Sequence, residues 1–152
     1  MGLRFGAGLI ATGVAALLGT CGGGDDEPTL PQLSAAVGGA MRGTCADLAG
    51  FSHANTTVTA ATAVDAGVLT VGGQPIAAHC RVTGRMHERV SPVDGQTYAI
   101  GFEMRLPLAW NGRYYYQGNG GTDGSVSNAY GTAGSGGPLS NALHKGFGVV
   151  SS

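Results

Sequence analysis

Charged residues are scarce in this sequence, and their scarcity narrows the functions open to it. Only 11% of the 152 residues are charged, and the formal net charge is −1. The sequence holds no basic stripe and no acidic tail. Binding to nucleic acid depends on clustered lysine and arginine, so we expect no nucleic-acid partner.

The sequence also lacks the spacing of a metal site. The four histidines, His53, His79, His87 and His144, form no paired motif such as HxxxH. His79 and Cys80 are adjacent, and adjacent side chains on a strand point to opposite faces. We therefore predict no metal site and no cofactor.

Glycine, in contrast, is abundant. The chain has 29 glycines, far above the usual share of about 7%. They are dispersed among apolar and β-branched residues without a three-residue period, which excludes collagen. This composition favours a loop-rich α/β or all-β structure.

The first residues have the pattern of an export signal. Met1–Thr20 carries one basic residue, Arg4, and an apolar run that is too short to span a bilayer. Leu18-Gly19-Thr20-Cys21 resembles a bacterial lipobox, in which the cysteine receives a lipid, although Thr20 departs from that pattern. Ordinary signal cleavage is the alternative. We expect an exported protein, either anchored through Cys21 in or near the periplasm or secreted.

Three segments are expected along the chain. Residues 1–21 form the signal peptide with its lipobox-like end. Residues 22–39 form a flexible tether, rich in glycine and acidic residues at its start. Residues 40–152 form the folded domain, with a short helix near residues 40–48.

Two cysteines remain once Cys21 is set aside. Cys45 and Cys80 are separated by 34 intervening residues, and an exported chain meets oxidising conditions in which they can join. A Cys45–Cys80 disulfide is the prediction, and two buried free thiols are the alternative.

Strands are expected through the middle of the chain. Residues 56–64, 68–71 and 77–86 are rich in strand-forming residues. Residues 98–106 alternate apolar and polar, which predicts one buried face and a solvent-facing side that carries Glu103 and Arg105. Turn residues at 92–95 predict that the last two strands pair antiparallel.

A glycine loop follows the short aromatic strand 113–117. Gly118, Asn119, Gly120 and Gly121 could present main-chain N–H groups to an oxyanion or a phosphate, although a plain turn fits the spacing equally well. Residues 139–145 are compatible with a helix, and the apolar run 147–150 is typical of a buried parallel strand. Strand, loop, helix and strand would make a right-handed crossover.

Several motifs in this half of the chain carry a family resemblance. Leu106-Pro107, Trp110-Asn111-Gly112-Arg113, Gly118-Asn119-Gly120-Gly121 and Lys145-Gly146-Phe147-Gly148-Val149-Val150-Ser151 together resemble the N-terminal part of the tannase and feruloyl esterase family. The resemblance extends from about Cys80 onward, and the positions of Cys45 and Cys80 also fit it.

The resemblance implies an α/β fold, namely the incomplete N-terminal part of an α/β-hydrolase-like sheet in which antiparallel strands lead into a β-loop-α-β crossover. It implies a serine esterase acting on phenolic esters of gallate or ferulate, with Gly118–Gly121 similar to the loop that donates an N–H to the oxyanion. The catalytic serine, aspartate and histidine of the family lie further along a longer chain. We therefore expect a fragment that is inactive alone and that leaves strand 147–150 as an uncovered edge.

Two other functions stay open from the sequence. One is an anchored binding module for carbohydrates or phenolics, with Trp110 and Tyr114–Tyr116 as an aromatic platform. The other is a structural lipoprotein without a ligand. Ser135 lies in a small-x-Ser-x-Gly pattern, but no apolar strand precedes it and no helix follows it, so it is not a nucleophile elbow.

Overall fold

A computed structural model describes residues 34–118, 124–132 and 141–152. All of these belong to one compact unit, Ser34–Ser152. The predicted signal peptide, Cys21, most of the tether, Asn119, Gly120, Gly121 and Ser135 lie outside the described residues.

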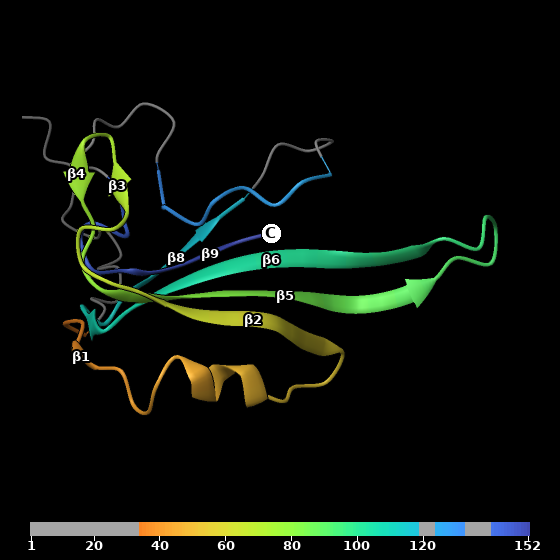
Figure 1. Ribbon diagram of the computed structural model, residues 1–152, viewed down its shortest axis with the longest axis horizontal. Helices are drawn as coiled ribbons and strands as arrows, with labels where there is room; N and C mark the ends of the chain where they lie inside the picture. The colour runs from red at the N-terminus through yellow and green to blue at the C-terminus, as the bar shows by residue number, and fades with distance from the viewer. Residues whose placement is uncertain (1–33, 119–123, 133–140) are drawn as a thin grey trace, which may run out of the picture. The chain divides into compact units, whose positions relative to one another are not determined.

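The described part of the chain is built mainly of strands (Figure 1). The strands are β1 (Gly39–Ala40), β2 (Thr56–Val64), β3 (Thr70–Val71), β4 (Gln74–Pro75), β5 (His79–Val90), β6 (Thr97–Pro107), β7 (Ala109–Trp110), β8 (Tyr114–Gln117) and β9 (Gly148–Ser151). Five of them form one sheet in the order β2-β5-β6-β9-β8. The pairs β1–β7 and β3–β4 are separate two-stranded sheets.

The β5–β6 hairpin is the longest pairing in the sheet. In its turn the Ser91 N–H donates to the Gln96 carbonyl and the Gly95 N–H donates to the Ser91 carbonyl, and Gly95 takes a φ of 70°. The Asp94 carboxylate accepts bonds from the Gln96 N–H and the Tyr98 hydroxyl. The antiparallel pairing of these strands, predicted from the turn residues at 92–95, is confirmed.

The sheet is mixed, because β9 pairs parallel with β8 and antiparallel with β6. The parallel strand predicted at residues 147–150 is therefore confirmed. The expectation that it would be an uncovered edge is wrong, because β9 lies between two strands and both of its edges take part in pairing. Short pairings on either side suffice to remove the exposed edge.

The helices expected from the sequence differ from those observed. Residues 40–48 were expected to form a helix, but the structure has a 3₁₀ helix η1 at Ala46–Gly50. Asp47 accepts bonds from the Thr44 N–H and hydroxyl and so fixes the start of this turn. The second expected helix, residues 139–145, is wrong in its described part, because residues 142–146 form a turn. The right-handed crossover stays a prediction.

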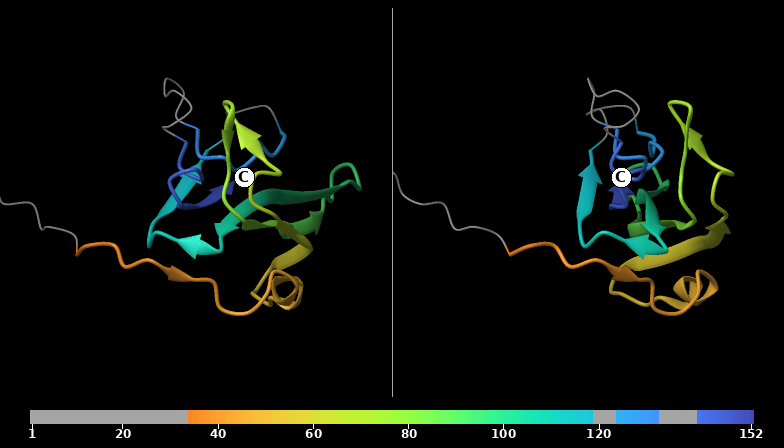
Figure 2. Two further views of the ribbon diagram at one scale, coloured as in Figure 1. Left: turned by 60° about the vertical axis from the view of Figure 1, so that its left-hand side comes forward. Right: turned by 90° about the vertical axis from the view of Figure 1, so that its left-hand side faces the viewer.

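The predicted disulfide joins Cys45 to Cys80, with their Cα atoms 5.5 Å apart. It ties the segment before η1 to the start of β5, and η1 lies beside β2 (Figures 1 and 2). The sheet faces differ in character. Cys80, Val82 and Phe102 are buried in one apolar cluster with Cys45, and partly buried Met104 and Leu106 pack against it.

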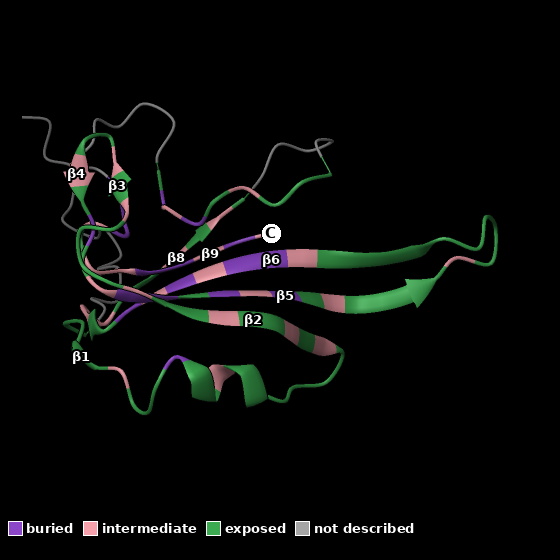
Figure 3. Ribbon diagram, viewed as in Figure 1, coloured by how far each residue is buried: buried purple, intermediate pink, exposed green. Residues whose placement is uncertain are grey.

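A second apolar cluster lies on the other face, around Ile76, Ala129, Ala142, Leu143 and Val149. Burial is concentrated where β5, β6 and β9 meet, and the far ends of β5 and β6 are exposed (Figure 3). Tyr98 and Ile100, predicted to be on the buried face, are each 46% exposed. They lie where β6 runs beyond its pairing with β9, so β6 is paired there with β5 alone.

No helix among the described residues is long and apolar enough to cross a membrane.

Candidate functional site

The glycine loop leaves the sheet at the end of β8. Gln117 is the last residue of β8, and the exposed Gly118 follows it. Because β8 and β9 are parallel, this point is at the carboxyl end of neighbouring parallel strands, where α/β sheets bind ligands. Of the four candidate oxyanion residues the structure describes only Gly118. The role of Gly118, Asn119, Gly120 and Gly121 stays a prediction.

A cluster of charged side chains lies beneath the segment that follows the glycine loop. Glu103, predicted to face solvent, is 4% exposed, and Arg105, predicted likewise, is 5% exposed. The prediction was wrong for both. A helix-free segment, residues 124–132, passes over this face of the sheet, and the Ala129 N–H donates to Glu103 Oε1 over 3.1 Å.

The Glu103 carboxylate separates two arginines that would otherwise repel each other. Arg81 and Arg105 are directly opposite each other on β5 and β6. The Arg81 Nε donates to Glu103 Oε2 over 2.8 Å, and the Arg105 Nε donates to Glu103 Oε1 over 2.8 Å. Like charges at opposed positions destabilise a sheet. One buried carboxylate between them converts that repulsion into a bridged triad.

Burial alone would raise the pKa of Glu103. The bond from Arg81, the Ala129 N–H and the charge of Arg105 together outweigh that effect and hold the pKa below its usual value. Glu103 is therefore a carboxylate at neutral pH, and it is not available to donate a proton. Its chemistry here is to accept hydrogen bonds.

His79 extends the cluster. Its Nε2 is 2.9 Å from Arg105 Nη1, which can only donate, so Nε2 accepts and carries no proton. Its Nδ1 then donates to the Ala77 carbonyl over 2.8 Å. Burial lowers the pKa of His79, and the positive charge of Arg105 lowers it further, against the opposing effects of the Ala77 carbonyl and Glu103. His79 is thus a neutral histidine with both nitrogens engaged.

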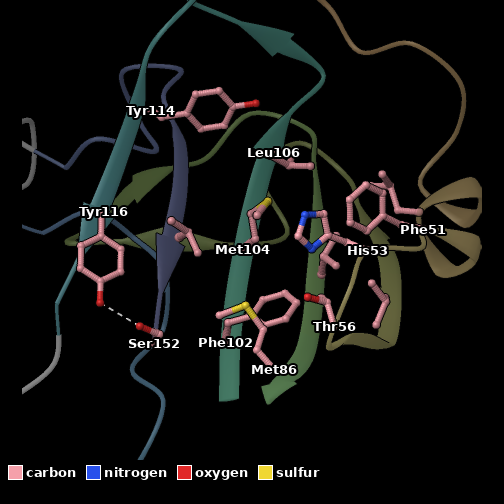
Figure 4. Close-up of a pocket in the computed structure, with 14 residues that line it drawn as sticks. Phe51, His53, Thr56, Met86, Phe102, Met104, Leu106, Tyr114, Tyr116 and Ser152 are labelled. Atoms are coloured by element: carbon pink, nitrogen blue, oxygen red, sulfur yellow. Dashed lines mark hydrogen bonds between the residues drawn. The ribbon is translucent and has the colours of Figure 1, made fainter. Parts of the chain in front are cut away.

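The opposite face of the sheet holds an apolar groove of about 620 Å³. Figure 4 shows side chains from β5, β6 and β8 and from the residues that follow η1 around it, among them Phe51, Met86, Phe102 and Met104. Tyr116 and Ser152 share a hydrogen bond of 2.8 Å between their oxygens.

His53 also lines this groove, but its Nδ1 is bonded to the Ala54 carbonyl over 3.2 Å. The described residues hold no cluster of three or more histidine, cysteine, aspartate or glutamate side chains that could hold a metal ion.

The predicted aromatic platform is only partly formed. Trp110 and Tyr114 contact each other, with ring centroids 5.0 Å apart and planes tilted by 47°. Tyr114 and Tyr116 line the groove and are 65% and 64% exposed. Tyr115 points to the other face and packs on the cluster around Val149. Strand alternation separates it from its two neighbours.

The charged cluster was not predicted, and the register of β5 and β6 shows why. The turn at 92–95 pairs Val90 with Thr97, and that register continued without interruption would place Arg81 opposite Leu106. The irregularity between Met86 and Arg89 shifts the register by one residue and brings Arg81 opposite Arg105. Neither the alternation along one strand nor pairing from the turn alone therefore indicates a buried ion cluster.

A known hydrolase shares sequence with this chain. Over 100 residues the chain is 37% identical to mono(2-hydroxyethyl) terephthalate hydrolase of Piscinibacter sakaiensis. The match takes in 66% of this chain and 16% of that protein, so the chain corresponds to a small part of its relative. No protein-family model matches the chain. The chain is therefore similar to a carboxylic ester hydrolase, the class of enzyme that the sequence motifs predict.

Proposed function

We propose that this chain is part of a tannase-like carboxylic ester hydrolase that acts on esters of phenolic or related aromatic acids. The identity of 37% over 100 residues with an ester hydrolase is the observation that carries the proposal. The order of the motifs from Leu106 to Ser151 also supports it.

In this proposal the loop beginning at Gly118 supplies a main-chain N–H to the oxyanion that forms when an ester carbonyl is attacked. The loop follows β8 at the end of its parallel pairing with β9. Donors fixed in place before the reaction stabilise that charge without reorganisation. The nucleophile and its base come from parts of the protein outside this chain, because the sequence has no nucleophile elbow.

The proposal is tested by assaying the complete gene product on methyl gallate, methyl ferulate and mono(2-hydroxyethyl) terephthalate. Residues 34–152 are assayed in parallel. We expect hydrolysis of at least one ester by the complete protein and none by residues 34–152. A folded complete protein that hydrolyses none of the three would overturn the proposal.

The role of the glycine loop has its own test in the complete protein. Removing one oxyanion donor typically lowers turnover by about 10²–10³. Gly120→Pro removes an N–H from the loop, and Gly67→Ala, at a turn with no atom near the added Cβ, is the control. Unchanged turnover in a folded Gly120→Pro protein would show that the loop is an ordinary turn.

Export and anchoring belong to the same proposal. The apolar run before Cys21 and the glycine-rich segment after it suit a lipid-anchored protein held away from a membrane. Labelling cells with a radioactive fatty acid should mark the protein and leave a Cys21→Ala variant unmarked. Label that persists in the variant would rule out an anchor at Cys21.

A second candidate function is the binding of aromatic ligands without catalysis. The groove bordered by Tyr114 and Tyr116 favours it, because its walls are apolar and aromatic. Trp110 is the single tryptophan and contacts Tyr114, so its fluorescence should respond to a ligand held there. Saturable quenching of residues 34–152 by methyl gallate would support binding, and no change up to millimolar concentrations would exclude it.

A further inference from the structure

The two chain segments that flank the glycine loop are joined by one side chain. Gln117, at the end of β8, donates from its Nε2 to the Asn128 carbonyl over 3.1 Å. Its Oε1 accepts from the Gly131 N–H over 2.8 Å. A single amide thus uses its donor and its acceptor to hold the segment that returns from the loop.

Glu103 holds the same returning segment from below. Its Oε1 accepts the Ala129 N–H, between the two residues that Gln117 binds. The guanidinium of Arg105 also lies over the Tyr130 ring, 5.0 Å from its centroid. Four consecutive residues, 128–131, are therefore fixed by side chains from β6 and β8.

The returning segment is also fixed on its far side. The Ala142 N–H donates to the Gly131 carbonyl over 2.9 Å, and the Leu143 N–H donates to the Tyr130 carbonyl over 3.2 Å. Ala129, Ala142 and Leu143 are buried together in one cluster. Residues 128–131 are thus held on both sides, and they form a rigid base at the end of the glycine-rich connection.

A loop rich in glycine has more backbone freedom than any other, and this freedom opposes the fixed geometry that an oxyanion site needs. We infer that Gln117 and Glu103 are positioning residues. They hold together Gln117 and residues 128–131, which flank the loop and which we call its neck, and so keep these residues in one arrangement. Gln117 is the more direct link of the two, because it immediately precedes the loop and its side chain bonds to residues that follow the loop. The effect on catalysis rests on the proposed function; the closed neck does not.

Two variants of Gln117 separate its two hydrogen bonds. Gln117→Met keeps the length of the side chain but removes both bonds. Gln117→Glu keeps the oxygen that accepts from Gly131, and it replaces the donor to Asn128 with a second oxygen. Gln96→Met, in the turn of the β5–β6 hairpin, is the matched control. Each variant is made in the complete protein.

Amide hydrogen exchange is measured residue by residue, together with kcat and KM on the best ester substrate. We expect Gln117→Met to speed exchange at Gly131 by about tenfold, the effect of losing hydrogen bonds of ordinary strength. Gln117→Glu should leave the Gly131 N–H protected. Exchange in β5 should not change. We expect kcat to fall by about tenfold with KM nearly unchanged, because the loop donates in the transition state.

Unchanged exchange at Gly131 in Gln117→Met would overturn the closed neck. Faster exchange with unchanged kcat would overturn the positioning role while leaving the neck in place. A complete protein without hydrolase activity would fail the proposed function, and the exchange at Gly131 would still decide whether Gln117 closes the neck.

Discussion

His79 and Cys80 are neighbours in the sequence, and their side chains make bonds on opposite faces of β5. Cys80 is bonded to Cys45 on the apolar face, and His79 accepts from Arg105 within the charged cluster. Both residues are almost completely buried. The start of β5 is therefore joined both to the disulfide and to the charged cluster.

Glu103 is expected to be the most sensitive position in the charged cluster. Glu103→Gln leaves Arg81 and Arg105 opposed across two strands without an anion between them. Removing one partner of a buried ion pair costs about 3 kcal/mol or more. The measurement is the free energy of unfolding of residues 34–152 in urea.

Glu88→Gln is the control for this change. Glu88 pairs with Arg85, but both side chains are more than half exposed, and exposed pairs contribute less than about 1 kcal/mol. Equal losses from the two variants would contradict the bridging role of Glu103.

Stability should fall in two stages as the pH is lowered. The pKa of His79 is below its usual 6.5 in the folded chain, so the unfolded chain binds more protons just below pH 6.5. The stabilisation is present above pH 6.5 and is lost as pH falls through the folded pKa. The pKa of Glu103 is below its usual 4.5, so its contribution is lost at lower pH, below 4.5.

Melting temperatures of residues 34–152 between pH 3 and pH 8, about the range these two groups cover, test both stages. His79→Gln retains an acceptor for Arg105 but cannot titrate. It should remove the upper stage and leave the lower one. An upper stage of unchanged size in His79→Gln would assign it to another group.

The limits of sequence reasoning are clear in this part of the chain. The strands and the hairpin turn could be predicted from local pattern, because each depends on few residues that are close in sequence. The disulfide could be predicted from the number of cysteines and from the expected export. The burial of Glu103 does not, since it depends on residues 124–132 passing over β6. Alternation shows which side chains share a face, but it does not show whether a distant segment covers that face.

The short elements were also hard to predict. A turn at residues 142–146 takes the place of the described part of the helix expected at residues 139–145, and a 3₁₀ helix at Ala46–Gly50 replaces the one expected at residues 40–48. Both contain residues that favour a helix, but both segments are too short for propensity to decide. The position of β9 between β6 and β8 could not be read from an apolar run, because such a run predicts burial without naming its neighbours.

The Cys45–Cys80 disulfide should contribute substantially to stability. It links residues 35 positions apart, and the chain-entropy account gives about 3–4 kcal/mol for a loop of that length. We expect the double variant Cys45→Ser, Cys80→Ser to have a melting temperature several degrees below that of the parent. An unreduced digest should show the two cysteine peptides joined. A double variant that melts with the parent would assign the link no stabilising role.

Gly131 is expected to tolerate no side chain, and a second glycine shows why. Gly131 has a φ of 67°, and an added Cβ would lie 2.5 Å from the Ala142 Cβ. Gly95 has a similar φ of 70°, but nothing lies within 4 Å of its added Cβ. Both alanine variants bear the cost of a left-handed backbone, about 1–2 kcal/mol. Only Gly131→Ala adds overpacking, about 1–3 kcal/mol more. The difference in unfolding free energy between the two variants therefore measures how tightly residues 128–131 are packed on residues 141–143, and equal losses would show that this base is not rigid.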